Sequence, residues 1–435
     1  MERMTPDLLR TYWSRTVSPV ICEAKVGAFK RVRDQLKAIV PLDMLQAKFG
    51  LMPRLTGQVE VSFSKWKEIP TFNMVATVLT PNLIEEVAQW GDVERMYPDY
   101  MKFAVQTVPS QGIYKDHKGV PFTSTYWTKR LMGLDRANEK GFTGRDIRAV
   151  VIDTGARATH EQLGRVRILT AMAEKGGSGI DFNGHGSWCC SCLGGARGFD
   201  RRYNVPVEGM APHCDLTSIQ ALGFIIGMGS SSDIISAMET CIGLDARVVS
   251  MSLGSNDALK DNENPEAVAI NALAEHGIVP CVAGGNSGPS PSTIGSPGSC
   301  LNSLTVGAWD PINGKMADFS SRGPTAGDGY IKPDVSAPGV RINSALVGFL
   351  DDMVDPTQPK YGPISGTSMS TPACAGLVTC MSQLYEEVIG KKLTVHEVKK
   401  MMEELGHEKT NLDGWGFLSW DLVERWVSSN YGKEI

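Results

Sequence analysis

One stretch near the C-terminal end decides how this chain is interpreted: Gly366-Thr367-Ser368-Met369-Ser370-Thr371-Pro372. Small residues surround a serine and an apolar run follows, so the pattern predicts a tight turn that enters a buried helix. Proline is tolerated in the first turn of such a helix. A serine at a helix N-terminus lies where free N–H groups and the helix dipole favour negative charge. Ser368 is therefore either a nucleophile or simply the cap of this helix.

Length and composition predict a soluble globular protein with more than one domain. The chain has 435 residues, of which 42% are hydrophobic and 21% are charged. A formal net charge of -5 and the lack of a long basic run argue against nucleic acid as a partner. No transmembrane segment is expected, because no stretch reaches about 18 consecutive apolar residues. No signal peptide is visible at the N-terminus, and localisation stays open.

The ten cysteines are too dilute for a small disulfide-built fold. Cys189, Cys190 and Cys192 cluster, but they lack the paired spacing of a zinc site. We predict that most of the ten are reduced, buried and act as small apolar residues.

The first 125 residues divide into three parts. Residues 1–57 predict an N-terminal extension that is partly helical, with a helix at Ala28–Val40. Residues 58–103 predict a compact α+β domain, whose expected strands and helix are 59–63, 72–79, 83–89 and 93–97. Residues 104–125 carry proline and glycine without periodicity, which predicts an exposed linker and a suitable place for a proteolytic cut.

From residue 126 onward the chain predicts an α/β domain with a mostly parallel sheet. Buried strands are expected at 148–152, 215–220, 247–251, 278–283 and 304–308. The clearest helices are expected at 232–244 and 266–276, and a further helix near 395–404. Alternating buried strands and helices favour a parallel sheet covered on both faces. Functional residues of such sheets gather at the carboxyl ends of the strands.

Two polar residues qualify as partners of Ser368. Asp153 ends an apolar strand, where a carboxylate can orient a histidine, although Asp-Thr-Gly also fits an ordinary turn. His185 lies between two glycines, which leave its imidazole accessible, whereas His213 and His276 are interpreted as structural. A nucleophilic serine needs such a base, and the base needs a carboxylate that fixes its tautomer.

These three motifs resemble those of the subtilisin-family serine peptidases, the subtilases. They read 151-VIDTG-155, 184-GHGS-187 and 366-GTSMSTP-372, and their order Asp, His, Ser matches that of subtilisin. The resemblance runs from about Trp127 to the C-terminus. It implies a three-layer α/β fold, with Asp153, His185 and Ser368 as the catalytic triad of a serine endopeptidase that uses an acyl-enzyme.

Other segments carry the resemblance further. 282-VAGGNSG-288 resembles the segment with the oxyanion-hole asparagine, which gives Asn286 and the backbone N–H of Ser368 that role. Without this motif Asn286 would be interpreted as a turn residue. The family's substrate-binding edges correspond to Gly227, Met228 and Gly229 on one side and to Ser252, Leu253 and Gly254 on the other. Protein or peptide substrates would pair there as an added strand.

The resemblance also suggests a substrate preference. Gly295 would lie at the base of the S1 pocket and leave room for a large apolar or aromatic P1 side chain. Ile234 and Leu253 would form an apolar S4 site. No acidic residue occurs in these stretches, which argues against strict selection of lysine or arginine.

The small domain at 58–103 resembles a subtilase propeptide in pattern and position, with an unrelated accessory domain as the alternative. The resemblance implies a self-processing zymogen with an intramolecular inhibitor. The chain departs from the family after His185, where 187-SWCCSC-192 replaces the usual residues, and after Pro372, where Ala373 replaces a histidine. Cys189 or Cys190 would then lie near His185, which predicts sensitivity to thiol reagents and heavy metals.

No cofactor or metal is predicted to be required. The segment 194–212 replaces the family's calcium loop with a basic stretch, and Asp351 and Asp352 fit solvated loop charges, so calcium is left open without a convincing site. The competing class is a binding or scaffolding protein on the same fold. Within the enzyme class, a dedicated processing peptidase competes with a broadly degradative one.

Overall fold

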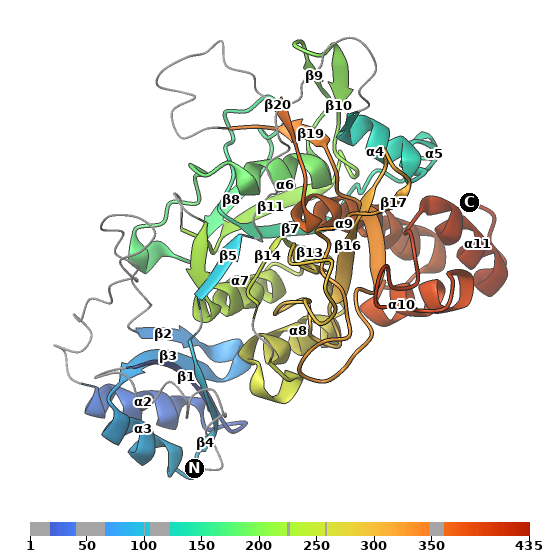
Figure 1. The fold of residues 1–435 in the computed structure, drawn as a ribbon. Helices are drawn as coiled ribbons and strands as arrows, with labels where there is room; N and C mark the ends of the chain where they lie inside the picture. Colours follow the sequence, from blue (N-terminus) through green and yellow to red (C-terminus); the bar gives the residue numbers. More distant parts are fainter. Residues whose placement is uncertain are drawn as a thin grey trace.

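The structure is a computed structural model that describes residues 18–40, 66–99, 101–104, 122–223, 227–256, 259–347 and 361–435, with only the backbone described for 101–104. It contains a small N-terminal domain, residues 18–99, and a larger α/β domain, residues 122–435 (Figure 1). The strand predicted at 59–63 lies outside the described residues.

The N-terminal domain is a four-stranded antiparallel sheet with two helices on one face. Its strands follow the order β2-β3-β1-β4. The elements are β1 (Ser18–Ala24), α2 (Phe29–Ile39), β2 (Trp66–Ile69), β3 (Met74–Leu79), α3 (Pro81–Ala88) and β4 (Val93–Pro98), with a 3-10 turn at Pro70–Phe72. Thr80 accepts a hydrogen bond from the N–H of Leu83 and so caps α3.

The predicted boundary at residue 57 is wrong, because β1 and α2 belong to the small domain. β1 lies in the middle of the sheet and pairs with β3 on one side and β4 on the other. The two faces of β1 are both covered, and the apolar run of this strand therefore lacks the polar alternation that would have revealed it.

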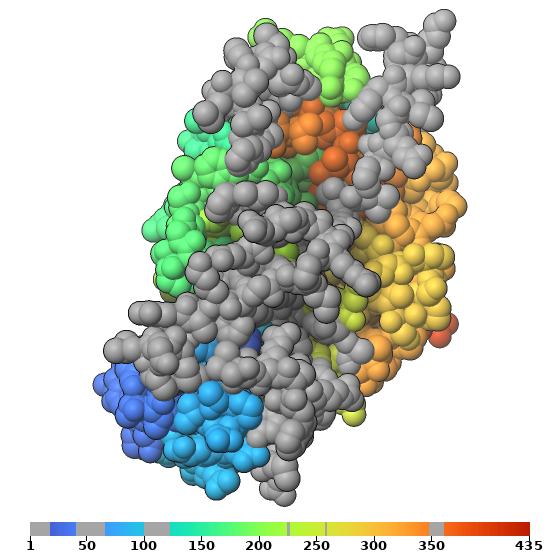
Figure 2. Space-filling model, turned by 60° about the vertical axis from the view of Figure 1, so that its left-hand side comes forward, coloured from blue at the N-terminus to red at the C-terminus, as the bar shows by residue number. Residues whose placement is uncertain are grey.

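Each face of the small sheet packs against different partners. Val20 and Cys22 of β1 point into a core shared with α2 and α3. Ile21, between them, points the other way and belongs to a core cluster with Ile234 and Met238 of the α/β domain. The apolar far face of the sheet therefore docks the small domain onto the larger one. Figure 2 shows the small domain, in blue, beside the larger domain.

The α/β domain is built on an eight-stranded sheet that is parallel except at one edge. The strand order is β17-β16-β15-β13-β7-β11-β8, and β18 also pairs with β16. The strands are β7 (Arg148–Asp153), β8 (Arg167–Thr170), β11 (Asp215–Gln220), β13 (Val248–Met251), β15 (Val279–Ala283), β16 (Leu304–Asp310), β17 (Lys315–Met316) and β18 (Val335–Pro338). This arrangement confirms the predicted α/β class with a central, mostly parallel sheet.

Helices cover both faces of this sheet. On one face lie α6 (His185–Gly194) and α9 (Thr367–Leu384), and on the other lie α7 (Ser231–Gly243) and α8 (Pro265–Glu275) (Figure 1). The alternation along β7 matches this layering: Ala149 and Val151 pack with α6 and α9, whereas Val150 and Ile152 pack with α7 and α8. The result is a three-layer domain.

The remaining elements surround this framework. They are β6 (Thr123–Ser124), α4 (Thr125–Leu131), α5 (Leu134–Glu139), β9 (Gly198–Asp200), β10 (Val205–Val207), β19 (Ile342–Ala345), β20 (Tyr361–Ile364), α10 (Val395–Leu405) and α11 (Trp420–Tyr431). β6 pairs with β19, so the predicted linker 104–125 ends inside the α/β domain. Residues 105–121 lie outside the described part. Trp420 and Trp426 of α11 are buried against the core.

All ten cysteines fall in the described part of the chain. Each is a free thiol, and Cys214 is the one that is partly exposed. This matches the predicted use of cysteine as a buried apolar residue. No described helix is long and apolar enough to cross a membrane.

Candidate active site

Asp153 and His185 form a buried pair at the carboxyl edge of the sheet. Asp153 is the last residue of β7, and its Oδ1 lies 2.7 Å from Nδ1 of His185. The same oxygen accepts a hydrogen bond from the N–H of Thr154 at 2.8 Å. Burial alone would lower the pKa of His185, but the Asp153 carboxylate outweighs burial and raises this pKa well above 6.5. The carboxylate therefore fixes the tautomer of the imidazole and stabilises its charged form.

The loop before His185 is held by a carboxylate that sequence reasoning missed. Asp181 is fully buried, and its Oδ1 accepts hydrogen bonds from the N–H groups of Asn183 and Gly184, both at 2.9 Å. Its Oδ2 accepts from the N–H of Ser187 at 2.8 Å. The spacing Asp-x-Asn-Gly fits such a side-chain-stabilised turn and was the available signal. Asp181 thus fixes the start of α6, where His185 stands.

Ser368 stands in the first turn of α9, as predicted, but Pro372 does not. α9 begins at Thr367, which puts Pro372 in its second turn. A proline there cannot donate to the carbonyl four residues back, which is that of Ser368. This carbonyl instead accepts a hydrogen bond from Oγ of Ser252 at 3.0 Å. The missing helical hydrogen bond is therefore replaced by one from Ser252, which links the residue of the candidate nucleophile to the segment predicted to bind substrate.

The Oγ of Ser368 has a long contact with Ser252 in this structure. It lies 3.4 Å from the carbonyl oxygen of Ser252, beyond the usual O–H···O distance. The Nε2 atom of His185 makes no hydrogen bond to any described residue. Hydrogen bonds between a nucleophile and its base are often long or poorly aligned until substrate binds.

Asn286 lies beside the same helix start. Its Oδ1 accepts hydrogen bonds from the N–H of Thr367 at 2.9 Å and from the Thr367 hydroxyl at 3.0 Å. These contacts orient the amide. A Cβ added to Gly366 would lie 3.2 Å from Nδ2 of Asn286 and 3.7 Å from the backbone nitrogen of Ser368. Both nitrogens therefore lie close to one point beside Ser368, and glycine at position 366 leaves that point without a side chain.

Cys189 occupies the space under the imidazole, one helical turn after His185. Its Sγ lies 3.9 Å from Nδ1 of His185 and 3.6 Å from the carbonyl oxygen of Ser368. Burial raises the pKa of this thiol to about 12, which keeps it protonated at neutral pH. Cys190 lies in the same helix, and burial raises the pKa of its thiol as well. Of the two candidates, Cys189 is the one that contacts His185.

The two predicted substrate-binding edges enclose a strand of the chain itself. β12 (Met228–Ser230) and β14 (Leu253–Gly254) flank β5 (Met101–Ala104) in an antiparallel three-stranded sheet (Figure 1). Phe103 pairs with Met228 on one side and with Gly254 on the other, and Ala104 pairs with Leu253. Gly229 pairs with Lys102, and Gly227 precedes the edge with a φ of 63°. Ser252, next to Leu253, reaches Ser368 as described above.

The residues proposed for the pockets are buried. Gly295 faces the carbonyl oxygen of Ser255, which an added Cβ would approach to 2.0 Å. Glycine is therefore needed here because two backbone segments lie in contact, through a bridge between Ser255 and Ser296. Ile234 and Leu253 are both fully buried in one core cluster.

The segment that replaces the family's calcium loop is the β9–β10 hairpin. Val205–Val207 pairs antiparallel with Gly198–Asp200. Among the described residues, one group combines three possible metal ligands within 4.8 Å, and it consists of Asp153, His185 and Cys189. We assign these residues to the site described above. The expectation that no cofactor is required remains a prediction, and Asp351 and Asp352 lie outside the described residues.

Comparison with known proteins identifies the family. The model of the subtilase family matches residues 144–416, a span that contains Asp153, His185, Asn286 and Ser368. The chain belongs to the subtilase family. Serine protease AprX of Bacillus subtilis is 34% identical over 298 residues, which cover 64% of this subtilase and 64% of AprX.

Two further relatives have different lengths. Pyrolysin of Pyrococcus furiosus is 38% identical over 205 residues, which cover 40% of this chain and 14% of pyrolysin. Subtilisin BL of Lederbergia lenta is 29% identical over 302 residues, which cover 69% of this chain and 99% of that protein. This subtilase thus spans less than two thirds of AprX and a small part of pyrolysin.

Proposed function

We propose that this subtilase is a serine endopeptidase that hydrolyses peptide bonds of protein or peptide substrates through an acyl-enzyme. The observation that carries the proposal is the 2.7 Å contact between Asp153 and His185, beside the helix start that bears Ser368. This pair supplies a base whose tautomer is fixed, and Ser368 supplies the nucleophile at a site that favours negative charge.

The reaction proceeds in two halves. Ser368 Oγ attacks the substrate carbonyl carbon while Nε2 of His185 accepts the hydroxyl proton. The C–N bond then breaks, and His185 donates this proton to the leaving amine. Water attacks the resulting ester, with His185 again as the base, and the acid product leaves. Asp153 holds the imidazole and stabilises its charged form throughout.

The oxyanion of each tetrahedral intermediate is stabilised by two donors. These are Nδ2 of Asn286 and the backbone N–H of Ser368, and the proximity of both nitrogens to Gly366 supports this role. Such donors are already oriented in the free protein and need no reorganisation as charge develops. Thr367 provides that orientation through its two hydrogen bonds to Oδ1 of Asn286.

Replacing Asn286 with alanine should lower kcat by about 100- to 1000-fold, the loss measured for the oxyanion asparagine of subtilisin. KM should change little, because the donor acts on charge that forms only in the transition state. Steady-state kinetics with a peptide substrate checks this. Asn302→Ala is the matched control, since this asparagine bonds to Asn271 away from the site. A raised KM with unchanged kcat would contradict the assignment.

The N-terminal domain acts as an intramolecular inhibitor in this proposal, and the chain is a self-processing zymogen. β5 follows this domain directly and fills the cleft between β12 and β14 as an added strand, which is how a substrate would pair. Ala104 pairs with Leu253, and the neighbouring Ser252 contacts Ser368. The bond to be cut therefore follows Ala104 within the next residues.

Mass spectrometry of the purified chain tests the processing step. Wild type should give one new N-terminus shortly after residue 104, within the predicted linker that ends at 125, and Ser368→Ala should remain uncut. The same cut in both proteins would point to another protease. A wild type that is fully active and uncut would contradict the zymogen proposal.

We also propose that the enzyme prefers large apolar or aromatic P1 residues. The stretches Ser252–Gly254 and Ser292–Gly298 carry no carboxylate that would select a basic P1 side chain. A peptide-library cleavage profile checks this preference, and it also distinguishes a dedicated processing peptidase from a broadly degradative one. Dominant cleavage after lysine or arginine would overturn it.

A further inference from the structure

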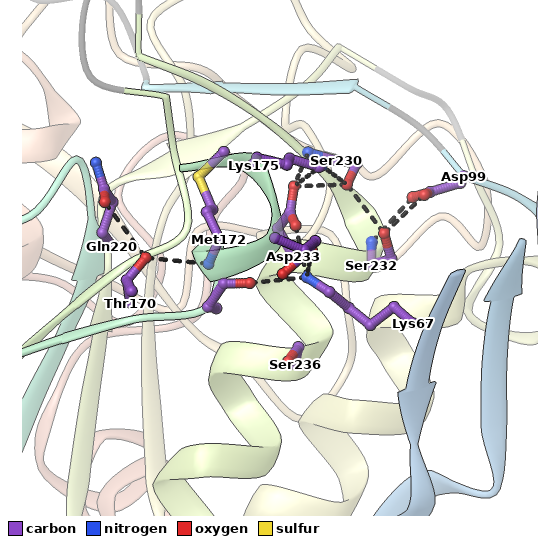
Figure 3. Close-up of polar contacts among 12 residues, drawn as sticks. Lys67, Asp99, Thr170, Met172, Lys175, Gln220, Ser230, Ser232, Asp233 and Ser236 are labelled. Atoms are coloured by element: carbon purple, nitrogen blue, oxygen red, sulfur yellow. Dashed lines mark hydrogen bonds and ion pairs between the residues drawn. The ribbon is translucent and has the colours of Figure 1, made fainter. Parts of the chain in front are cut away.

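A lysine of the N-terminal domain is buried in the interface with the α/β domain. Lys67 lies in β2, and its side chain is 8% exposed. Its Nζ lies 2.7 Å from Oδ1 of Asp233 (Figure 3). The same Nζ lies 2.8 Å from the carbonyl oxygen of Ala171 and 2.9 Å from Oε1 of Glu174. Because all three oxygens belong to the α/β domain, the small domain inserts one ammonium group into a site made by its neighbour.

The α/β domain itself holds Asp233 in place. Oδ2 of Asp233 accepts hydrogen bonds from Nζ of Lys175 at 2.6 Å and from the hydroxyl of Ser230 at 2.7 Å (Figure 3). Asp233 is fully buried and forms a capping box with Ser230 at the start of α7. The position of this carboxylate is therefore set by its own domain, and Lys67 completes its surroundings with a second ammonium group.

The contacts fit a charged primary amine. An ammonium group has three hydrogens to donate, and three acceptors lie within 2.9 Å of Nζ. Burial alone would lower the pKa of Lys67, but the Asp233 carboxylate outweighs burial and raises this pKa, so the group stays charged. A planar guanidinium presents its donors in a fork, which does not match acceptors gathered around one nitrogen.

The interface has a second polar contact beside this one. Asp99, at the end of the small domain, accepts hydrogen bonds from the N–H of Ser232 at 2.9 Å and from its hydroxyl at 2.7 Å (Figure 3). Asp99 therefore remains to hold the domain when Lys67 is changed. Removing the Lys67 ammonium, in contrast, takes from the buried Asp233 one of its two ammonium partners, which is costly because the buried charge loses part of its compensation.

We propose that Asp233, Glu174 and the carbonyl of Ala171 form a recognition site for a primary ammonium group, which Lys67 fills while the N-terminal domain is docked. After the chain has been cut, the N-terminal domain dissociates only when the Lys67 ammonium leaves this site, and this step limits the rate of dissociation. The proposal rests on the proposed zymogen function, because it concerns the interval between self-cleavage and the appearance of activity. Lys67 is thus a positioning residue of the inhibitor.

The test follows the full-length chain through its own processing. Gel electrophoresis reports the cut, and hydrolysis of a peptide substrate reports free enzyme. Lys67→Ala should shorten the interval between the two by about tenfold or more, the equivalent of about 1.4 kcal/mol or more. Lys37→Ala is the matched control, because Lys37 of the same domain pairs with Glu68 and is 51% exposed. It should behave as wild type.

Chemical rescue distinguishes the site from a general loss of packing. Millimolar n-propylammonium, which supplies the three missing carbons and the charge, should restore the interval in Lys67→Ala, whereas neutral propan-1-ol should not. Lys67→Arg should leave the interval short. Equal rescue by the alcohol, or an interval in Lys67→Ala equal to that of wild type, would overturn the proposal.

Failure of the ammonium-site proposal can be distinguished from failure of the proposed function. If wild type neither cuts itself nor hydrolyses peptide, the proposed function fails, and docking is then measured without activity. Amide hydrogen exchange of β2 and of the start of α7 in the Ser368→Ala chain gives this second readout. Adding Lys67→Ala should speed exchange there, and n-propylammonium should slow it again. Should Lys67→Ala not fold, Lys67→Met carries the interval and exchange measurements, and unchanged exchange and interval in that variant overturn the site.

Discussion

Replacing Ser368 with alanine is expected to lower kcat for peptide hydrolysis by about a million-fold, the size measured for loss of the nucleophile in subtilisin. The reason is that the attacking oxygen is removed. The Asp153–His185 pair and the oxyanion donors remain in place, but there is no hydroxyl for the base to activate. Steady-state kinetics with a peptide substrate measures the loss. Reaction with a fluorophosphonate probe should label wild type on Ser368 and leave the variant unlabelled.

A matched control guards against a loss of folding. Ser382 lies in the same helix, and its hydroxyl donates to the carbonyl of Val378 at 2.9 Å, away from the site. Ser382→Ala should keep wild-type turnover and labelling. Near-normal hydrolysis by Ser368→Ala would overturn the proposed mechanism. A wild type that binds peptides but is neither labelled nor active would instead favour a binding protein on this fold.

The residues of the site could be predicted because their motifs are short and local. Asp153 ends a strand, His185 begins a helix between two glycines, and Ser368 stands in a first helical turn, so each has a signature within about five residues. The parallel sheet and its covering helices follow from the alternation of apolar strands and helices for the same reason.

The parts that could not be predicted depend on contacts between distant segments. β1 shows no alternation because both of its faces are buried, so its place in the small domain appears only with its partners β3 and β4. Lys67 and Asp233 are 166 positions apart, and each alone resembles an ordinary surface charge. Pro372 leaves the carbonyl of Ser368 without its usual helical hydrogen bond, and Ser252 donates to that carbonyl instead. This contact also could not be predicted, because the folded structure brings the two distant segments together.

The residues that hold the N-terminal domain lie next to the strand that pairs with β5. α7 begins directly after β12, the strand that pairs with β5, so Asp233 and Ser232 lie within five positions of Met228. The contacts of Lys67 and Asp99 with the start of this helix therefore adjoin the strand that binds the proposed cut segment. An inhibitor held there stays aligned with the cleft until these buried polar contacts are lost.

Replacing Asp153 with asparagine should lower kcat by about 10,000-fold, the loss measured for the equivalent change in another serine peptidase. In wild type the carboxylate raises the pKa of His185 well above 6.5, although burial acts in the opposite direction. Only the neutral imidazole can accept the proton of Ser368. Activity of wild type should therefore fall as the pH falls through this raised pKa, and the enzyme should work best in alkaline solution.

The pH profile distinguishes this role from a structural one. Without the carboxylate, burial lowers the pKa of His185, so the residual activity of Asp153→Asn should persist to lower pH than that of wild type. A profile of kcat/KM against pH, from pH 5 to 10, measures the acid limb of wild type and that of the variant. Asp215→Asn is the control, because Asp215 is 47% exposed and pairs with Arg148 at the far end of the neighbouring strand. An acid limb that stays in place, or moves to higher pH, would contradict the assignment of Asp153 as the group that raises the pKa of His185.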